Sequence, residues 1–102
     1  MIYISGKMTG EKNLNYPLFD GVAKSLREQG KEVFTPSEII LDKTGLSEWG
    51  IYEGYMDICL EAVENCDTIY LLNGWNNSKG AKRELKRALE LGLNVIMQGD
   101  FI

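Results

Sequence analysis

The sequence contains no histidine, which excludes any mechanism that needs an imidazole base or ligand from this chain. It has only two cysteines, Cys59 and Cys66, whose number and spacing fit neither a disulfide framework nor a zinc site. The carboxylates also lack metal-ligand spacing, so we expect no metal and no cofactor. A chain with so few cysteines suits a reducing compartment, and we expect a cytoplasmic protein.

Long apolar runs are also missing. None approaches the roughly 20 residues of a membrane span, and residues 1–5 lack the basic segment and apolar core of a signal peptide. The 15 acidic residues outnumber the 11 basic ones, and the single basic cluster, in residues 79–87, is local. We therefore expect no membrane partner, and a small-molecule nucleotide rather than a nucleic-acid polymer as any nucleotide partner.

Short apolar runs alternate with helical patterns along the whole chain. The runs at residues 2–4, 32–35, 67–72 and 93–97 predict buried strands, and the patterns from Pro17, Ser47 and Ser78 predict helices. In the helix after Ser47, the expected apolar stripe is Trp49, Tyr52, Met56, Cys59, Val63 and Cys66. In the last helix, the expected buried stripe is Ala81, Leu85, Ala88 and Leu89. This alternation predicts a single α/β domain over residues 1–102, a doubly wound four-stranded parallel sheet of order 2-1-3-4 with helices on both faces.

Two glycine-bearing loops follow the first and third predicted strands. In a doubly wound sheet both lie at the carboxyl edge beside the switch point, where ligands bind. The backbone amides of Ser5–Gly10 could face a ligand there, and an ordinary strand-exit turn is the alternative. In the loop Asn73–Asn77, Trp75 is the candidate for stacking on a base.

Glu84 has an unusual position for a charged residue. It flanks the apolar stripe of its helix, about 60° from Ala81 and about 40° from Ala88 at about 100° per residue. This position favours a nucleophile or base held beside a sugar. The alternative is an exposed ion pair between Glu84 and Arg87 at i, i+3.

The start of the same helix and the helix before it add further candidates. Ser78 is a candidate N-cap at a helix start where amides and dipole favour an anion, and Gly80 would let the backbone come close to a ligand. Asp57 falls on a polar helix face with Glu53, Glu61 and Glu64, where solvation is the default interpretation.

Three segments together carry a family resemblance: Tyr3–Gly10, Asp57-Ile58 followed by Asn65-Cys66-Asp67, and Ser78-x-Gly80-Ala81-x-x-Glu84. They resemble the nucleoside 2-deoxyribosyltransferase-like superfamily, and most of all its short DUF4406 group. The resemblance implies a flavodoxin-like fold and cleavage of the N-glycosidic bond of a deoxynucleoside or its 5′-monophosphate. It makes Glu84 the nucleophile of a glycosyl-enzyme ester, and Asp57 the residue that protonates the leaving base or orients the sugar and nucleophile.

Substrate binding is accordingly assigned to the two loops and their flanks: Tyr3, Ser5, Gly6, Lys7, Met8, Gly10, Asn73, Gly74, Trp75, Ser78 and Gly80. A serine at position 78 resembles the nucleotide N-hydrolases and favours a 5′-monophosphate. The tail after residue 97 is shorter than that of characterised transferases, which favours hydrolysis or binding over base transfer. We expect a homodimer or higher homo-oligomer that packs through apolar parts of the second helix. The alternatives are a non-catalytic binder of nucleotides or nucleotide-derived signals, and a structural domain of an assembly.

Overall fold

The strands of the protein form one parallel sheet. The computed structural model describes residues 1–100 as β1 (Ile2–Ser5), α1 (Tyr16–Glu28), β2 (Val33–Phe34), α2 (Glu48–Glu64), β3 (Thr68–Leu71), α3 (Lys79–Leu91) and β4 (Asn94–Met97), with short 3₁₀ turns η1 (Lys12–Asn15), η2 (Pro36–Glu38) and η3 (Trp75–Asn77). The sheet order is β2-β1-β3-β4 and every pairing is parallel. The predicted topology is therefore confirmed.

Local sequence signals set the helix boundaries. The Ser47 hydroxyl accepts a hydrogen bond from the Gly50 amide (3.1 Å) at the start of α2, and the Ser78 hydroxyl accepts one from the Ala81 amide (3.1 Å) at the start of α3. Both are N-caps that satisfy an amide without an intrahelical partner. Gly92 ends α3 with a φ of 75°, which a glycine adopts without a steric penalty.

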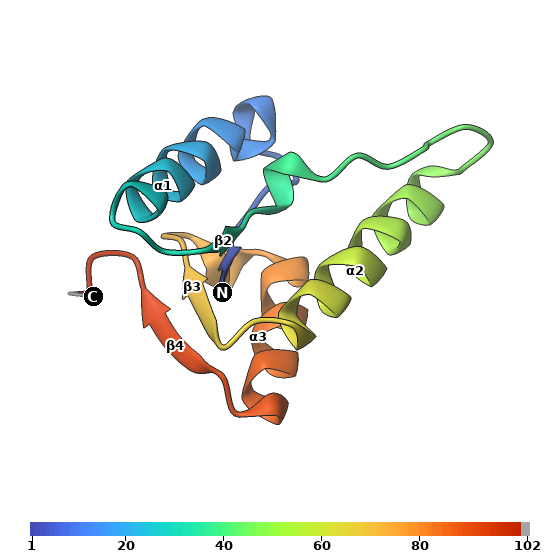
Figure 1. The fold of residues 1–102 in the computed structure, drawn as a ribbon. Coiled ribbons are helices and arrows are strands. Elements are labelled where there is room, and N and C mark those ends of the chain that lie inside the picture. The colour runs from blue at the N-terminus through green and yellow to red at the C-terminus, as the bar shows by residue number, and fades with distance from the viewer. Residues whose placement is uncertain (101–102) are drawn as a thin grey trace.

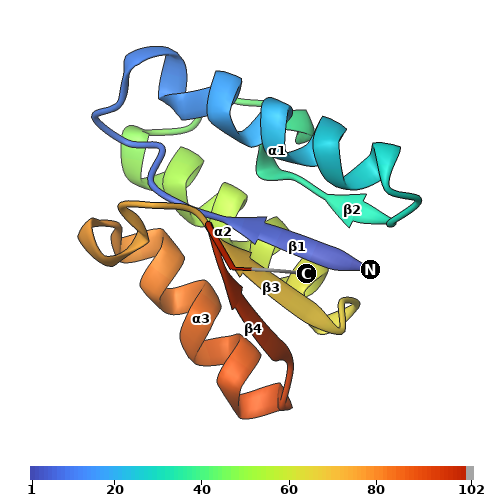
Figure 2. The same cartoon turned by 90° about the vertical axis from the view of Figure 1, so that its left-hand side faces the viewer.

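The helices lie on both faces of the sheet (Figure 1), with α1 on one face and α2 and α3 on the other. The twist of the sheet and the crossing of α1 over the β1–β2 side are seen in Figure 2. Each face has its own core cluster, and β1 contributes to both because successive strand side chains point to opposite faces. Ile2 and Ile4 pack with Phe19 of α1, whereas Tyr3 packs with Val63 of α2 and Ala88 of α3.

Two residues of the predicted apolar stripes are exposed instead. Leu89 was expected in the buried stripe of α3, and this is wrong, since it is 60% exposed. It lies about 200° around the helix from Arg87, which faces α2, so it occupies the flank of α3 away from that helix. Trp49 is 68% exposed because the first turn of α2 extends past the sheet (Figure 1). Within residues 1–100, no helix combines the length and apolar character needed to cross a membrane.

Candidate functional site

The candidate site is built around Glu84 of α3, whose side chain is buried against β1. Its side chain is only 5% exposed. The Tyr3 hydroxyl donates to Oε2 and the Ser5 hydroxyl donates to Oε1, each at 2.6 Å. Tyr3 and Ser5 are two apart on β1, so both point to the α2–α3 face. The Tyr3 ring also stacks on Phe34 (5.5 Å between centroids), which holds its hydroxyl toward the carboxyl group.

Burial dominates the electrostatics of this cluster. Desolvation raises the pKa of Glu84 above its usual 4.5, and hydrogen bonds from Ser5, Tyr3 and the thiol of Cys59 oppose that rise. The pKa of Tyr3 lies well above 10.0, first because of burial and then because of the negative charge of Glu84. The same two causes raise the pKa of Cys59 to about 12. Glu84 is therefore the group of this cluster that changes charge most readily.

The alternative interpretation of Glu84 as half of an exposed ion pair with Arg87 is wrong. Arg87 instead binds Glu64 of α2 (2.8 Å), and Arg83 binds Glu53 of the same helix (2.9 Å). These two partly exposed ion pairs join α2 to α3. They leave the carboxyl group of Glu84 to face the sheet.

The structure does not bring Asp57 into this cluster. Its side chain is exposed, on the opposite side of α2 from the core. Cys59 follows two residues later, about 200° around the helix, and the charge of the nearby Glu84 contributes to the rise in its pKa. The cysteine is 4% exposed and shares the core cluster of Tyr3 and Ala88. The catalytic role assigned to Asp57 stays a prediction.

The loop after β1 is held in place by packing and by its own polar contacts. A Cβ on Gly6 would lie 2.9 Å from the Leu72 side chain, so the glycine permits close contact between the exits of β1 and β3. Met8 packs against the α1 core cluster, and Lys7 pairs with Glu11 (3.7 Å). Gly10, which is exposed, has a φ of 84°, a turn conformation that favours glycine.

A strained segment follows this loop. Asn13, Leu14 and Asn15 have φ values of 53°, 54° and 61°, in the left-handed region that non-glycine residues rarely adopt. The Asn15 amide donates to the Lys7 carbonyl (3.0 Å) and ties the segment back to the loop. The sequence interpretation did not anticipate this conformation, although its asparagines tolerate it better than most residues.

The loop after β3 leads into α3, the helix that carries Glu84. Asn73 and Gly74 are exposed, whereas Trp75 packs partly against the α2–α3 core cluster. Ser78 caps α3, as predicted. A Cβ on Gly80 would lie 3.3 Å from the sulfur of Met56, so this glycine lets α3 begin close against α2.

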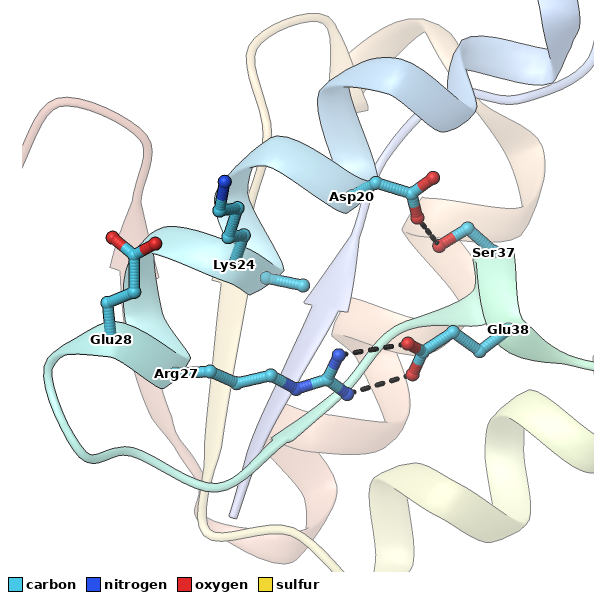
Figure 3. A pocket seen from close by; sticks show the side chains of 7 residues that line it. Asp20, Lys24, Arg27, Glu28, Ser37 and Glu38 are labelled. Carbon is cyan, nitrogen blue, oxygen red and sulfur yellow. Dashed lines mark hydrogen bonds and ion pairs between the residues drawn. The ribbon is translucent and has the colours of Figure 1, made fainter.

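A surface hollow lies on the other face of the sheet, away from these loops. Figure 3 shows it between α1 and η2, crossed by the Arg27–Glu38 ion pair. The ion pair is 2.8 Å long, and the hollow has a volume of about 570 Å³. No predicted site residue lines it. No three His, Cys, Asp or Glu side chains of residues 1–100 come together as a metal site.

Sequence reasoning named Tyr3, Ser5 and Glu84, and the structure brings these three together. It assigned Tyr3 and Ser5 to the substrate, whereas both are fully buried and donate to Glu84. It placed Cys59 on an apolar stripe and missed its contact with the carboxyl group. The sequence signal for that contact was the apolar stripe of α2, because the side of the helix that carries Cys59, and not the side that carries Asp57, faces the sheet.

No curated protein matches the chain. The model of the family described as "Domain of unknown function (DUF4406)" matches residues 1–97, and the chain therefore belongs to this family.

Proposed function

We propose that the protein cleaves the N-glycosidic bond of a deoxynucleoside or its 5′-monophosphate, with Glu84 as the nucleophile, as in the nucleoside 2-deoxyribosyltransferase-like superfamily that it resembles. The observation that carries the proposal is the buried carboxyl group of Glu84, held by two hydroxyl donors beside the carboxyl end of β1. Within residues 1–100 this group has no ion-pair partner, and its two hydrogen bonds fix its orientation. Nucleophiles and bases are commonly found in environments of this kind.

The course of the proposed reaction is the one that the resemblance implies. One carboxylate oxygen of Glu84 attacks the anomeric carbon of the sugar, and the bond to the base breaks. Water then hydrolyses the resulting ester and regenerates the carboxylate. The hydroxyls of Tyr3 and Ser5 fix the orientation of the carboxylate, since each of its oxygens accepts one of them. Asp57 remains a candidate for protonating the base or orienting the sugar.

The same proposal includes binding of a 5′-phosphate at the start of α3. The Ser78 hydroxyl accepts from the Ala81 amide and keeps its own proton for a ligand oxygen. Lys79 and Lys82 are exposed within the first turns of the same helix. A helix start with added positive charge favours an anion. We therefore favour the monophosphate over the free deoxynucleoside, in a reducing cytoplasmic compartment.

The test measures free base by chromatography after incubation with deoxynucleosides and their 5′-monophosphates. We expect Glu84→Gln to lower the release rate by about 10³-fold or more, as the loss of a nucleophile does. Glu90→Gln, which changes an exposed carboxylate of the same helix, is the matched control and should leave the rate unchanged. Release that survives Glu84→Gln contradicts the proposal.

A non-catalytic binder of nucleotides is the second candidate. The observation in its favour is that both oxygens of Glu84 are already occupied by hydroxyl donors in a site that is 5% exposed. Under this candidate, titration calorimetry gives tight binding without base release, and Glu84→Gln leaves the affinity unchanged. Absence of both binding and release would reject both candidates.

A homodimer or higher homo-oligomer belongs to the proposal as well. Leu46 and Trp49 are 44% and 68% exposed and lie next to and in the first turn of α2, and Ile40, which is 95% exposed, lies in the loop before it. Exposed apolar side chains on a protruding element are typical of an interface. Light scattering at micromolar concentration tests this point, and a monomer would contradict it.

A further inference from the structure

An apolar surface lies at β4, the edge strand of the sheet (Figure 1). Val95 and Met97 stand beside Ile69 and Leu71 of β3, whose side chains belong to the α2–α3 core cluster, so they lie on that face. They are nevertheless 38% and 45% exposed, and Leu89, on the flank of α3 away from α2, is 60% exposed. We call Leu89, Val95 and Met97 the β4 patch. Strands of parallel sheets are normally covered on both faces, so the patch indicates a surface that a partner covers.

The outer edge of β4 leaves one residue for backbone pairing. The Asn94 amide donates to the Asp67 carbonyl on the β3 side (3.0 Å). Backbone groups alternate along a strand, so those of Val95 and Met97 point outward. The Met97 amide donates to the Asp100 carboxylate (2.9 Å), and the Met97 carbonyl accepts from the Asp100 amide (2.9 Å). Val95 is therefore the residue of β4 whose outward groups can pair with another strand.

A single pairing position favours a second copy of the chain over an extended peptide. A peptide that adds to a sheet edge draws its affinity from a row of main-chain hydrogen bonds, and Asp100 interrupts that row. A second copy can meet the edge antiparallel about a twofold axis beside Val95. Two hydrogen bonds then form from one residue of each chain, because opposed residues of antiparallel strands exchange both bonds. The axis also closes the pairing at two copies.

The charges beside the β4 patch are complementary about the same axis. Lys86 and Glu90 of α3 are exposed, and within residues 1–100 neither belongs to an ion pair. Their midpoint is Ala88. The chain reverses at Gly92, and β4 rises about 3.3 Å per residue against about 1.5 Å in the helix, which brings Val95 roughly level with Ala88. An axis beside Val95 therefore sets Lys86 of each copy toward Glu90 of the other.

We infer that the β4 patch is a twofold interface with a second copy of this chain, in which Val95 pairs with its own counterpart and Lys86 faces Glu90 across the axis. The two copies of α3 run antiparallel, so the positive end of each helix dipole also lies toward the negative end of the other. This surface is separate from the apolar side chains before and in the first turn of α2. Use of both surfaces gives a closed assembly of four copies. The inference is independent of the proposed reaction.

The test is disulfide cross-linking of Val95→Cys under mild oxidation. The Cα atoms of an antiparallel hydrogen-bonded pair are about 5.5 Å apart, within the range that a disulfide spans. Asn94→Cys is the matched control, because it is an exposed position of the same strand whose counterparts lie two residues out of register. We expect disulfide-linked dimer, measured on a denaturing gel, to form about 10-fold or more faster in Val95→Cys. The native Cys59 and Cys66 are buried and present in both variants.

A second variant measures the association without a cross-link. Leu89→Glu places a carboxylate of each copy near the axis, where like charges oppose association. We expect the dissociation constant, measured by light scattering over a dilution series, to rise by about 10²-fold or more. Leu91→Glu, which changes another exposed leucine about 200° around the same helix, is the control and should leave the constant unchanged. Because Leu89 is exposed, the variant should keep the circular dichroism spectrum of the unaltered protein.

The contrary results are distinct. Cross-linking no faster in Val95→Cys than in Asn94→Cys overturns the inference, and so do equal effects of Leu89→Glu and Leu91→Glu. Association that is lost in Trp49→Glu but kept in Leu89→Glu also overturns it, and assigns the homo-oligomer to the surface at the start of α2. A monomer at every concentration overturns it as well and leaves the β4 patch to a different protein.

Discussion

The two faces of the sheet are built from different chemistry. On the α1 face, Ile2 and Ile4 pack with Phe19, Ala23 and other apolar side chains, and the charges stay at the rim. On the α2–α3 face, the next residues of the same strand carry hydroxyls that hold a buried carboxyl group. One four-residue strand therefore contributes to an apolar core on one face and to a polar cluster on the other, because its successive side chains point to opposite faces of the sheet.

The energetic contributions of the two faces also differ. Apolar burial contributes about 25 cal/mol per Å² to folding, so the α1 face is a source of stability. A buried carboxyl group costs free energy unless hydrogen bonds compensate, and here no buried side-chain N or O of residues 1–100 lacks a partner. A leucine at position 84 would remove the buried carboxyl group but leave the buried hydroxyls of Tyr3 and Ser5 without their acceptor. The retained carboxyl group is what we interpret as functional.

The largest effect on stability is predicted for the α1 face. Phe19→Ala should lower the free energy of unfolding by about 3–5 kcal/mol, because it empties a fully buried position. Urea denaturation measures this loss. Ile4→Val, at about 0.5–1.5 kcal/mol, covers the case in which Phe19→Ala does not fold. Equal costs for Phe19→Ala and Glu84→Gln would break the contrast between the faces.

A smaller effect is predicted in the pH dependence of stability. Because the folded protein raises the pKa of Glu84, its proton-linked stabilisation is complete below about pH 4.5 and is lost as the pH rises through the folded pKa. Each unit by which the two pKa values differ is worth about 1.4 kcal/mol. We therefore expect the free energy of unfolding of the unaltered protein to decline between pH 4 and pH 8, and we expect no such decline in Glu84→Gln. Denaturation of both proteins across this pH range measures the difference.

Two comparisons keep this pH prediction specific. Glu38, Asp42 and Asp67, whose pKa values are lowered, titrate in both proteins, so the difference between the two curves isolates Glu84. Tyr3→Phe removes a hydrogen bond that lowers the pKa of Glu84, so the decline should extend to higher pH. A gain in stability with rising pH that disappears in Glu84→Gln would show the opposite shift.

The smallest effect is predicted for the exposed ion pairs. Arg87→Ala should lower the free energy of unfolding by about 1 kcal/mol or less, because its partner Glu64 is half-exposed and water screens the pair. Thermal melts at low and high salt measure it. A loss comparable with that of Phe19→Ala would mean that the α2–α3 bridges, rather than the apolar core, hold this face together.

The sequence allowed the topology and the edge position of Glu84 on its helix to be predicted because both have local signals. Alternating apolar runs and helical periods defined the strands and helices, and the capping serines marked the starts of α2 and α3. The edge position of Glu84 on its helix was also visible. The contacts of Glu84 were not, since Tyr3 lies 81 positions away along the chain.

By itself the sequence therefore determined the order of the elements, the parallel sheet and the residues that each loop carries. Only the tertiary structure decided that Glu84 is buried and not paired with Arg87, and that the stripe of α2 that carries Cys59 packs beside it. The physical reason is that periodicity sets the face on which a side chain lies, whereas packing between elements sets its partners. Partners in turn fix its burial and its pKa.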